Sequence, residues 1–191
     1  MNYCSNCGTP VTLRVPDGDT LPRHVCPACE SIFYHNPKIV TGCVPETDGG
    51  LLLCRRAIEP RYGYWTLPAG FMENGETVQQ AAIRETWEES AARVELVGLY
   101  ALFNIVHVNQ VYMMFRARVL EQAGRPGHET LEIRVFDEPD LPWGELAFPV
   151  IRHTLEHYFR DRASGDFPLR TGTIDRHRGG GPDAEPAGSS A

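Results

Sequence analysis

The chain has 191 residues, which is enough for one domain with a hydrophobic core and a small additional unit. Its hydrophobic fraction of 42% and charged fraction of 23% are those of an ordinary globular protein, and it has no stretch of about 18 apolar residues that could span a membrane. The formal net charge of −7 offers no basic stripe to a nucleic-acid backbone, so we expect neither a membrane nor a nucleic acid as a partner.

The N-terminal segment carries the first of two cysteine pairs. MNYCSNC has neither the charged region nor the apolar region of a secretory signal, which predicts a cytoplasmic protein whose cysteines bind metal or stay buried as thiols. The pairs are C-x-x-C motifs, formed by Cys4 with Cys7 and by Cys26 with Cys29. Two such pairs predict a tetrahedral Zn²⁺ site with a closed set of four thiolates, and therefore a structural role. Two disulfides, or a metal-free redox pair, are the alternatives.

Residues 1–35 around these cysteines are expected to form a separate unit. The segment VPDGDTLP between the pairs is typical of a hairpin loop. A unit this short cannot bury enough apolar surface to fold by itself, so bound zinc would supply the missing stability. The unit resembles a zinc ribbon.

A β-hairpin is predicted next. Residues 39–45 and 51–55 are apolar runs joined by Asp48-Gly49-Gly50, a turn sequence. Cys43 and Cys54 lie inside these runs, and we interpret both as small buried hydrophobic residues.

The end of this hairpin holds candidates for substrate contact. Arg55 and Arg56 are either solvated charges or a clamp on a phosphate or an adenine ring. Tyr64 and Trp65 follow, and such aromatic residues either belong to the core or stack on a flat ring. We retain Arg55, Arg56 and Trp65 as substrate-binding candidates.

A helix is predicted within residues 70–92. Thr77 is followed three residues later by Gln80, the pattern of a capping box at a helix start. Good helix formers follow without Gly or Pro, so the helix should span residues 78–90.

This helix has one strongly acidic face, because Glu85, Glu88 and Glu89 stand at positions i, i+3 and i+4. Like charges at this spacing repel one another, whereas hard cations such as Mg²⁺ and Mn²⁺ bind carboxylate oxygens and keep positions open for phosphates. A solvated acidic face is the alternative.

The same stretch resembles the Nudix box at Gly70, Glu76, Arg84, Glu85, Glu88 and Glu89. The resemblance implies an α/β protein, an α/β/α sandwich with a mixed β-sheet, that hydrolyses a pyrophosphate bond with Mg²⁺ or Mn²⁺. Two positions depart from the family pattern: Ala91 replaces the usual Gly and Thr86 replaces an apolar residue. Ala91 affects the geometry of the helix end and not the ligands.

The resemblance also assigns roles. Glu85, Glu88 and Glu89, with the Gly70 carbonyl, would hold the metal, and the carboxylates are catalytic candidates. Arg84 would orient these carboxylates rather than contact substrate, with Glu76 as structural support.

Further strands are predicted at residues 94–108, 110–120 and 131–136, with a loop at 124–130. In the loop, Glu129 is by resemblance to zinc-ribbon Nudix proteins a further metal ligand or the residue that handles the attacking water. A surface charge beside an edge strand is the alternative.

The last element expected is a helix at residues 151–162, after Pro149 at its first turn. Its His153 and His157 are interpreted as surface residues. The Nudix domain would thus span residues 36–163, and residues 164–191 would be a tail that is disordered from about residue 179.

Most of the chain resembles the zinc-ribbon Nudix proteins that hydrolyse FAD and ADP-ribose. That implies a small dinucleotide as substrate and a homodimer as assembly. NADH pyrophosphatases rank second, because their SQPWPFP motif is replaced here by LYALFNIVHVNQVYMMF. A nucleotide sensor without catalysis is a further alternative, although none of the box acids is missing.

Overall fold

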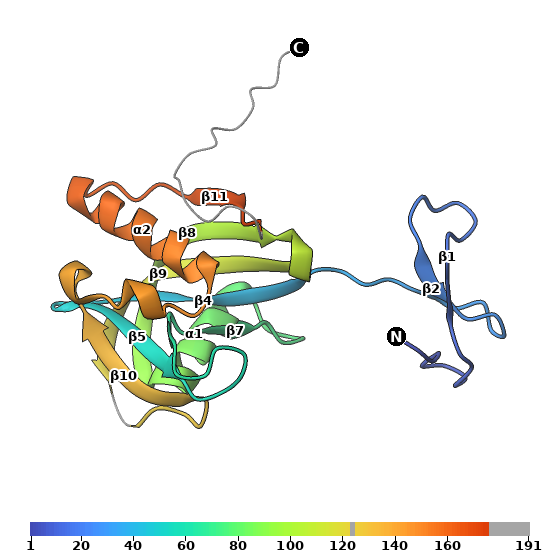
Figure 1. Cartoon of the computed structure of the whole chain (residues 1–191), viewed down its shortest axis with the longest axis horizontal. Coiled ribbons are helices and arrows are strands. Elements are labelled where there is room, and N and C mark those ends of the chain that lie inside the picture. The colour runs from blue at the N-terminus through green and yellow to red at the C-terminus, as the bar shows by residue number, and fades with distance from the viewer. Residues whose placement is uncertain (123–124, 176–191) are drawn as a thin grey trace, which may run out of the picture. The chain divides into compact units, whose positions relative to one another are not determined.

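The computed structural model describes residues 1–122 and 125–175 (Figure 1). They form two compact units, Met1–Pro37 and the residues from Lys38 onward. The expected disordered tail from about residue 179 and the start of the loop at Gly124 lie outside the described residues. None of the helices in the described residues is long and apolar enough to cross a membrane.

The first unit is a small antiparallel sheet of β1 (Thr12–Arg14), β2 (Arg23–Val25) and β3 (Ile32–Phe33), in the order β1-β2-β3. Its buried residues are Cys4, Pro16, Val25 and Cys26. An apolar core of this size contributes little folding energy, which agrees with a unit stabilised by its cysteines.

The second unit contains an eight-stranded mixed sheet in the order β10-β5-β4-β9-β8-β11, with β6 paired to β5 and β7 to β4. The β4–β9 and β8–β11 pairs are parallel and the other pairs are antiparallel. The strands are β4 (Lys38–Thr47), β5 (Gly50–Arg56), β6 (Trp65–Thr66), β7 (Ala69–Phe71), β8 (Ala92–Ile105), β9 (Gln110–Gln122), β10 (Thr130–Phe136) and β11 (Arg170–Thr173).

Two helices, α1 (Val78–Ser90) and α2 (Pro149–Ser164), cover opposite faces of this sheet (Figure 1). Successive residues of a central strand enter different cores: Cys43 packs with Ala82 of α1, whereas Val44 packs with Leu155 of α2. Because side chains alternate along a strand, this division places one helix on each face. The expected α/β/α sandwich with a mixed sheet is confirmed, as is the burial of Cys43 and Cys54.

The local signals set the helix ends closely. The capping box of Thr77 and Gln80 is present, and Ala91 adopts the left-handed conformation with a φ of 51°. The expected strand 94–108 ends earlier, at Ile105, and a short 3₁₀ turn, η1 (Val106–Val108), follows it. The segment before α2 contains two further 3₁₀ turns, η2 (Glu138–Asp140) and η3 (Trp143–Glu145).

Helix α2 is longer than expected at both ends. It begins at Pro149, whose fixed φ suits a first turn, and it continues to Ser164, where Gly165 ends it in the left-handed conformation. Asp161 in its last turn accepts a hydrogen bond from the Tyr100 hydroxyl at 2.7 Å and pairs with Arg170. These contacts join α2 to β8 and β11.

Candidate active site and zinc centre

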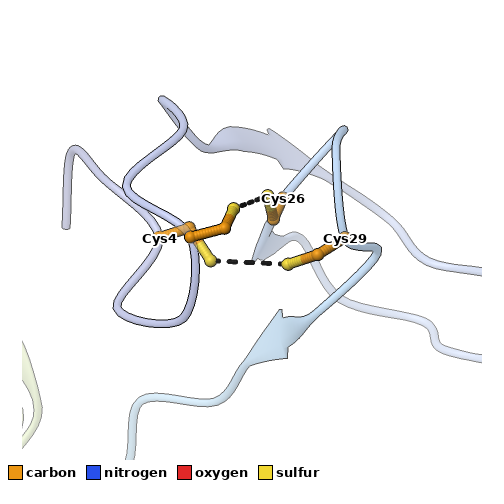
Figure 2. Close-up of side chains that lie close together, drawn as sticks. Cys4, Cys26 and Cys29 are labelled. Atoms are coloured by element: carbon orange, nitrogen blue, oxygen red, sulfur yellow. Dashed lines mark hydrogen bonds between the residues drawn. The ribbon is translucent and has the colours of Figure 1, made fainter.

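The first unit brings the predicted zinc ligands together. The sulfur atoms of Cys4, Cys7, Cys26 and Cys29 all lie within 4.8 Å of one another. The sulfur atoms of Cys4 and Cys29 are 3.6 Å apart (Figure 2). Those of Cys7 and Cys26 are 3.5 Å apart. A disulfide needs about 2.05 Å, whereas a tetrahedron with Zn–S bonds of about 2.3 Å places its sulfurs about 3.8 Å apart. The arrangement fits a structural Zn²⁺ and not the disulfide alternative.

The second unit contains a cavity of about 1790 Å³. Five of the six positions that resemble the Nudix box line this cavity: Gly70, Arg84, Glu85, Glu88 and Glu89. Glu129, from the loop before β10, lines it as well. The fold therefore brings the acidic face of α1 and the later Glu129 to one space, as the proposed roles require.

Arg84 is fixed by hydrogen bonds on several sides. It donates to both Glu76 oxygens at 3.0 and 2.7 Å, to Glu85 at 2.7 Å, to Glu88 at 3.1 Å and to the Phe71 carbonyl at 3.1 Å. This pairing, with the Glu73 amide, holds the pKa of Glu76 at about 2. A guanidinium so engaged orients the carboxylates around it.

Glu89 is a buried carboxyl group that forms no salt bridge with any residue the structure describes. It is 9% exposed, and the Ala69 amide at 3.4 Å is its hydrogen-bond donor. Burial, together with the nearby charge of Glu85, raises the pKa of Glu89 to about 8; burial also raises the pKa of Glu85. Desolvated carboxylates in one cavity favour a cation as their partner, and their hard oxygen atoms fit Mg²⁺ or Mn²⁺.

The glutamates are grouped less tightly than the cysteines. Among the residues that the structure describes, the cysteine cluster is the one group of three or more acidic, Cys or His side chains arranged to hold a metal ion. Arg84 contacts both Glu85 and Glu88. The Glu88 side chain is 54% exposed, so it is accessible from the solvent.

Two glycines allow close packing around these acids. A Cβ atom on Gly70 would lie 2.3 Å from a Glu85 carboxylate oxygen, so only glycine lets that carboxylate approach the β7 backbone. A Cβ atom on Gly127 would lie 2.2 Å from the Glu88 carbonyl oxygen. The loop before β10 therefore rests directly on the last turn of α1, and this contact sets the position of Glu129.

Glu129 is positioned mainly through its backbone. Its carbonyl accepts a hydrogen bond from the Ala57 amide at 2.8 Å. Its carboxylate is half-exposed, lines the cavity and lies 3.6 Å from His128 Nε2. Its charge contributes to the raised pKa of both Glu85 and Glu89, after burial as the main cause, which places it near the acidic face.

The structure corrects two substrate-binding candidates. Trp65 is 4% exposed and packs edge-on against Phe136 with ring centroids 4.8 Å apart, so it belongs to the core. Arg55 pairs with Trp65 in the ladder, and its side chain is directed to the Gly63 carbonyl and to Glu132, not to the cavity. Because side chains alternate along β5, Arg56 is the one of the two arginines that lines the cavity.

His153 and His157, which we interpreted as surface residues, are partly exposed and line the cavity. Burial lowers the pKa of His157. Their spacing on α2 shows that they share a face. The sequence contains no signal that this face meets the cavity.

Comparison with known proteins gives consistent matches. Residues 2–35 match the family model "Nudix N-terminal" of the zinc-ribbon type, and residues 36–158 match the model of the NUDIX domain. A crystal structure of a NUDIX hydrolase from Nitrosomonas europaea is 52% identical, with a TM-score of 0.88 over 91% of this chain and 99% of that one.

Curated relatives resemble the chain over part of their length. The NAD-capped RNA hydrolase NudC of Deinococcus radiodurans is 32% identical over 177 residues, which cover 86% of this chain and 59% of that protein. The ADP-ribose pyrophosphatase of Methanocaldococcus jannaschii is 31% identical over 122 residues, 61% of this chain and 70% of that protein. For an NAD-capped RNA hydrolase of Chromobacterium violaceum, the match covers only 33% of the relative.

Proposed function

Because the chain belongs to the Nudix family, we propose that it hydrolyses the pyrophosphate bond of a nucleoside diphosphate linked to another moiety. The observation that carries this proposal is the group of acidic side chains on one cavity wall, with Glu89 buried among them. On a solvated acidic face the carboxylates would stay in contact with water. In a site for a divalent cation they are buried, because the cation compensates their charge.

Each residue has a role that its surroundings support. Glu85, Glu88 and Glu89 would hold Mg²⁺ or Mn²⁺, with the Gly70 carbonyl and Glu129 as further ligands, and the bound ion would neutralise the diphosphate and lower the pKa of a water. Arg84 would keep Glu85 in place through their 2.7 Å contact, as an orienting residue rather than a substrate ligand. Glu129 is the candidate for accepting the proton of the attacking water, because its carboxylate is half-exposed at the cavity.

FAD and ADP-ribose are the substrates we propose first. The resemblance over most of the chain favours them, and the similarity to an ADP-ribose pyrophosphatase supports the second. Cleavage of NADH is the other candidate, which the similarity to an NAD-capped RNA hydrolase favours. That relative also makes NAD-capped RNA a necessary probe, against our expectation of no nucleic-acid partner.

The test is a side-by-side assay of FAD, ADP-ribose, NADH and an NAD-capped oligonucleotide, with Mg²⁺ and with Mn²⁺. We expect phosphate-ester products from at least one dinucleotide. If the protein binds one of these compounds stoichiometrically and hydrolyses none of them, it is a nucleotide sensor and not a hydrolase. Analytical ultracentrifugation of the full chain tests the expected homodimer.

A further inference from the structure

A second part of the cavity wall consists of arginine side chains lying over aromatic rings. The guanidinium carbon of Arg56 is 5.1 Å from the ring centroid of Phe148, and that of Arg61 is 5.3 Å from the ring centroid of Tyr64. All four residues line the same cavity as the glutamates. We refer to Arg56, Arg61, Tyr64 and Phe148 as the arginine–aromatic wall.

Three hydrogen bonds join Arg56 to the loop between β5 and β6. The Arg56 amide donates to the Tyr64 carbonyl at 2.9 Å, and its carbonyl accepts from the Gly63 amide at 2.9 Å. Its side-chain Nε donates to the Pro60 carbonyl at 3.0 Å. The Arg56 backbone is therefore fixed in the loop, and its side chain is restrained by one hydrogen bond before any ligand arrives, which lowers the entropic cost of binding.

Phe148 comes from a distant part of the sequence and is fixed as well. The Ala147 amide beside it donates to the Trp65 carbonyl at 2.8 Å, and its own carbonyl accepts the Ile151 amide at 3.1 Å in the first turn of α2. Tyr64 directly precedes β6, and the segment with Phe148 is hydrogen-bonded to β6. Both rings therefore line the same cavity from segments attached to one strand.

The wall adjoins the acidic face of α1 through Arg56. Arg56, Glu89 and Tyr112 line the same cavity. A molecule that places its diphosphate at the glutamates meets the wall with one of its halves.

We propose that the arginine–aromatic wall binds a flat heteroaromatic ring carried by one half of the substrate. A flat aromatic ring gains from stacking on tyrosine and phenylalanine and on the guanidinium planes beside them. An aliphatic or inorganic diphosphate has no aromatic ring that could stack on this wall. Adenine and the flavin ring share this chemistry. The inference rests on the proposed function only in assigning the ring to a diphosphate substrate.

Binding of uncleavable ligands tests the wall without hydrolysis. AMP and FMN carry rings, whereas ribose 5-phosphate carries the same phosphate without one, and calorimetric titration of the full chain with each gives the dissociation constants. We expect wild-type protein to bind AMP or FMN at least about tenfold more tightly than ribose 5-phosphate. The better of the two rings identifies which half the wall receives.

Variants locate the effect. Phe148→Leu and Tyr64→Leu should each weaken ring binding by about tenfold and leave ribose 5-phosphate unchanged. Tyr62→Leu is the matched control, because Tyr62 is an exposed ring in the same loop that does not line the cavity. Thermal melting shows that each variant is folded.

Equal binding of AMP, FMN and ribose 5-phosphate would overturn the inference. So would folded Phe148→Leu and Tyr64→Leu proteins that bind like Tyr62→Leu, since the stacks would then only stabilise the loop. A protein that hydrolyses nothing yet prefers ring-bearing ligands would refute the proposed hydrolase and leave the wall assignment standing.

Discussion

Replacing Gly70 by alanine tests the active-site geometry with a single added carbon. The new Cβ would lie 2.3 to 2.5 Å from the carboxylate atoms of Glu85. An ordinary contact needs about 3.4 Å, so the carboxylate must move by roughly 1 Å. A displacement of this size in a reacting group costs about a hundredfold in rate, and we expect kcat for the best dinucleotide to fall by about that factor.

The matched control is Gly98→Ala, because a Cβ on Gly98 meets no atom within 4 Å. It should keep full activity. Raising the Mg²⁺ or Mn²⁺ concentration should restore part of the Gly70→Ala activity if the displaced Glu85 is a metal ligand. A folded Gly70→Ala protein with kcat within about threefold of wild type would refute both the steric argument and the role of Glu85.

Further predictions concern the acids, the zinc and a histidine. Glu88→Gln should lose about a hundredfold or more in kcat with its fold intact, whereas Glu95→Gln, which removes a surface partner of Arg118, should not; equal turnover would contradict the metal assignment. Elemental analysis should find about one zinc per chain, and a fully folded zinc-free protein would refute the four-thiolate centre. Gly127→Ala should lower kcat by moving Glu129, since its Cβ would collide with the Glu88 carbonyl, and a melting curve separates this effect from unfolding. Burial lowers the pKa of His157 in the folded state, so the unfolded chain binds a proton at higher pH than the folded one does. The free energy of unfolding should therefore fall as the pH drops below about 6.5. In urea titrations the free energy of unfolding of His157→Gln should depend less on pH, and an unchanged pH dependence would exclude His157 as its source.

The helix of the active site could be predicted from the sequence because its determinants are local. The capping box at Thr77 fixes the start, and the spacing of Glu85, Glu88 and Glu89 fixes their common face, whatever the rest of the chain does. The four cysteines are similar, since each C-x-x-C pair forms within one tight turn.

The rest of the site depends on how distant segments meet. Whether Arg55 or Arg56 faces the cavity depends on which side of β5 the cavity lies, and only the assembled sheet decides that. Phe148 and the histidines of α2 reach the cavity through the packing of α2 against the sheet. The burial of Trp65 follows from its contact with Phe136, which lies on another strand.

The hydrogen bonds of Arg84 have a consequence for how this site tolerates change. A single guanidinium serves Glu76, Glu85 and Glu88 at once, so removing one acid lets the other two redistribute around the charge that remains. Double-mutant cycles among these positions should therefore show strong epistasis, with coupling energies of about 0.5 to 3 kcal/mol. Glu76, Glu85 and Glu88 should therefore respond to substitution as one coupled set and not as three independent positions.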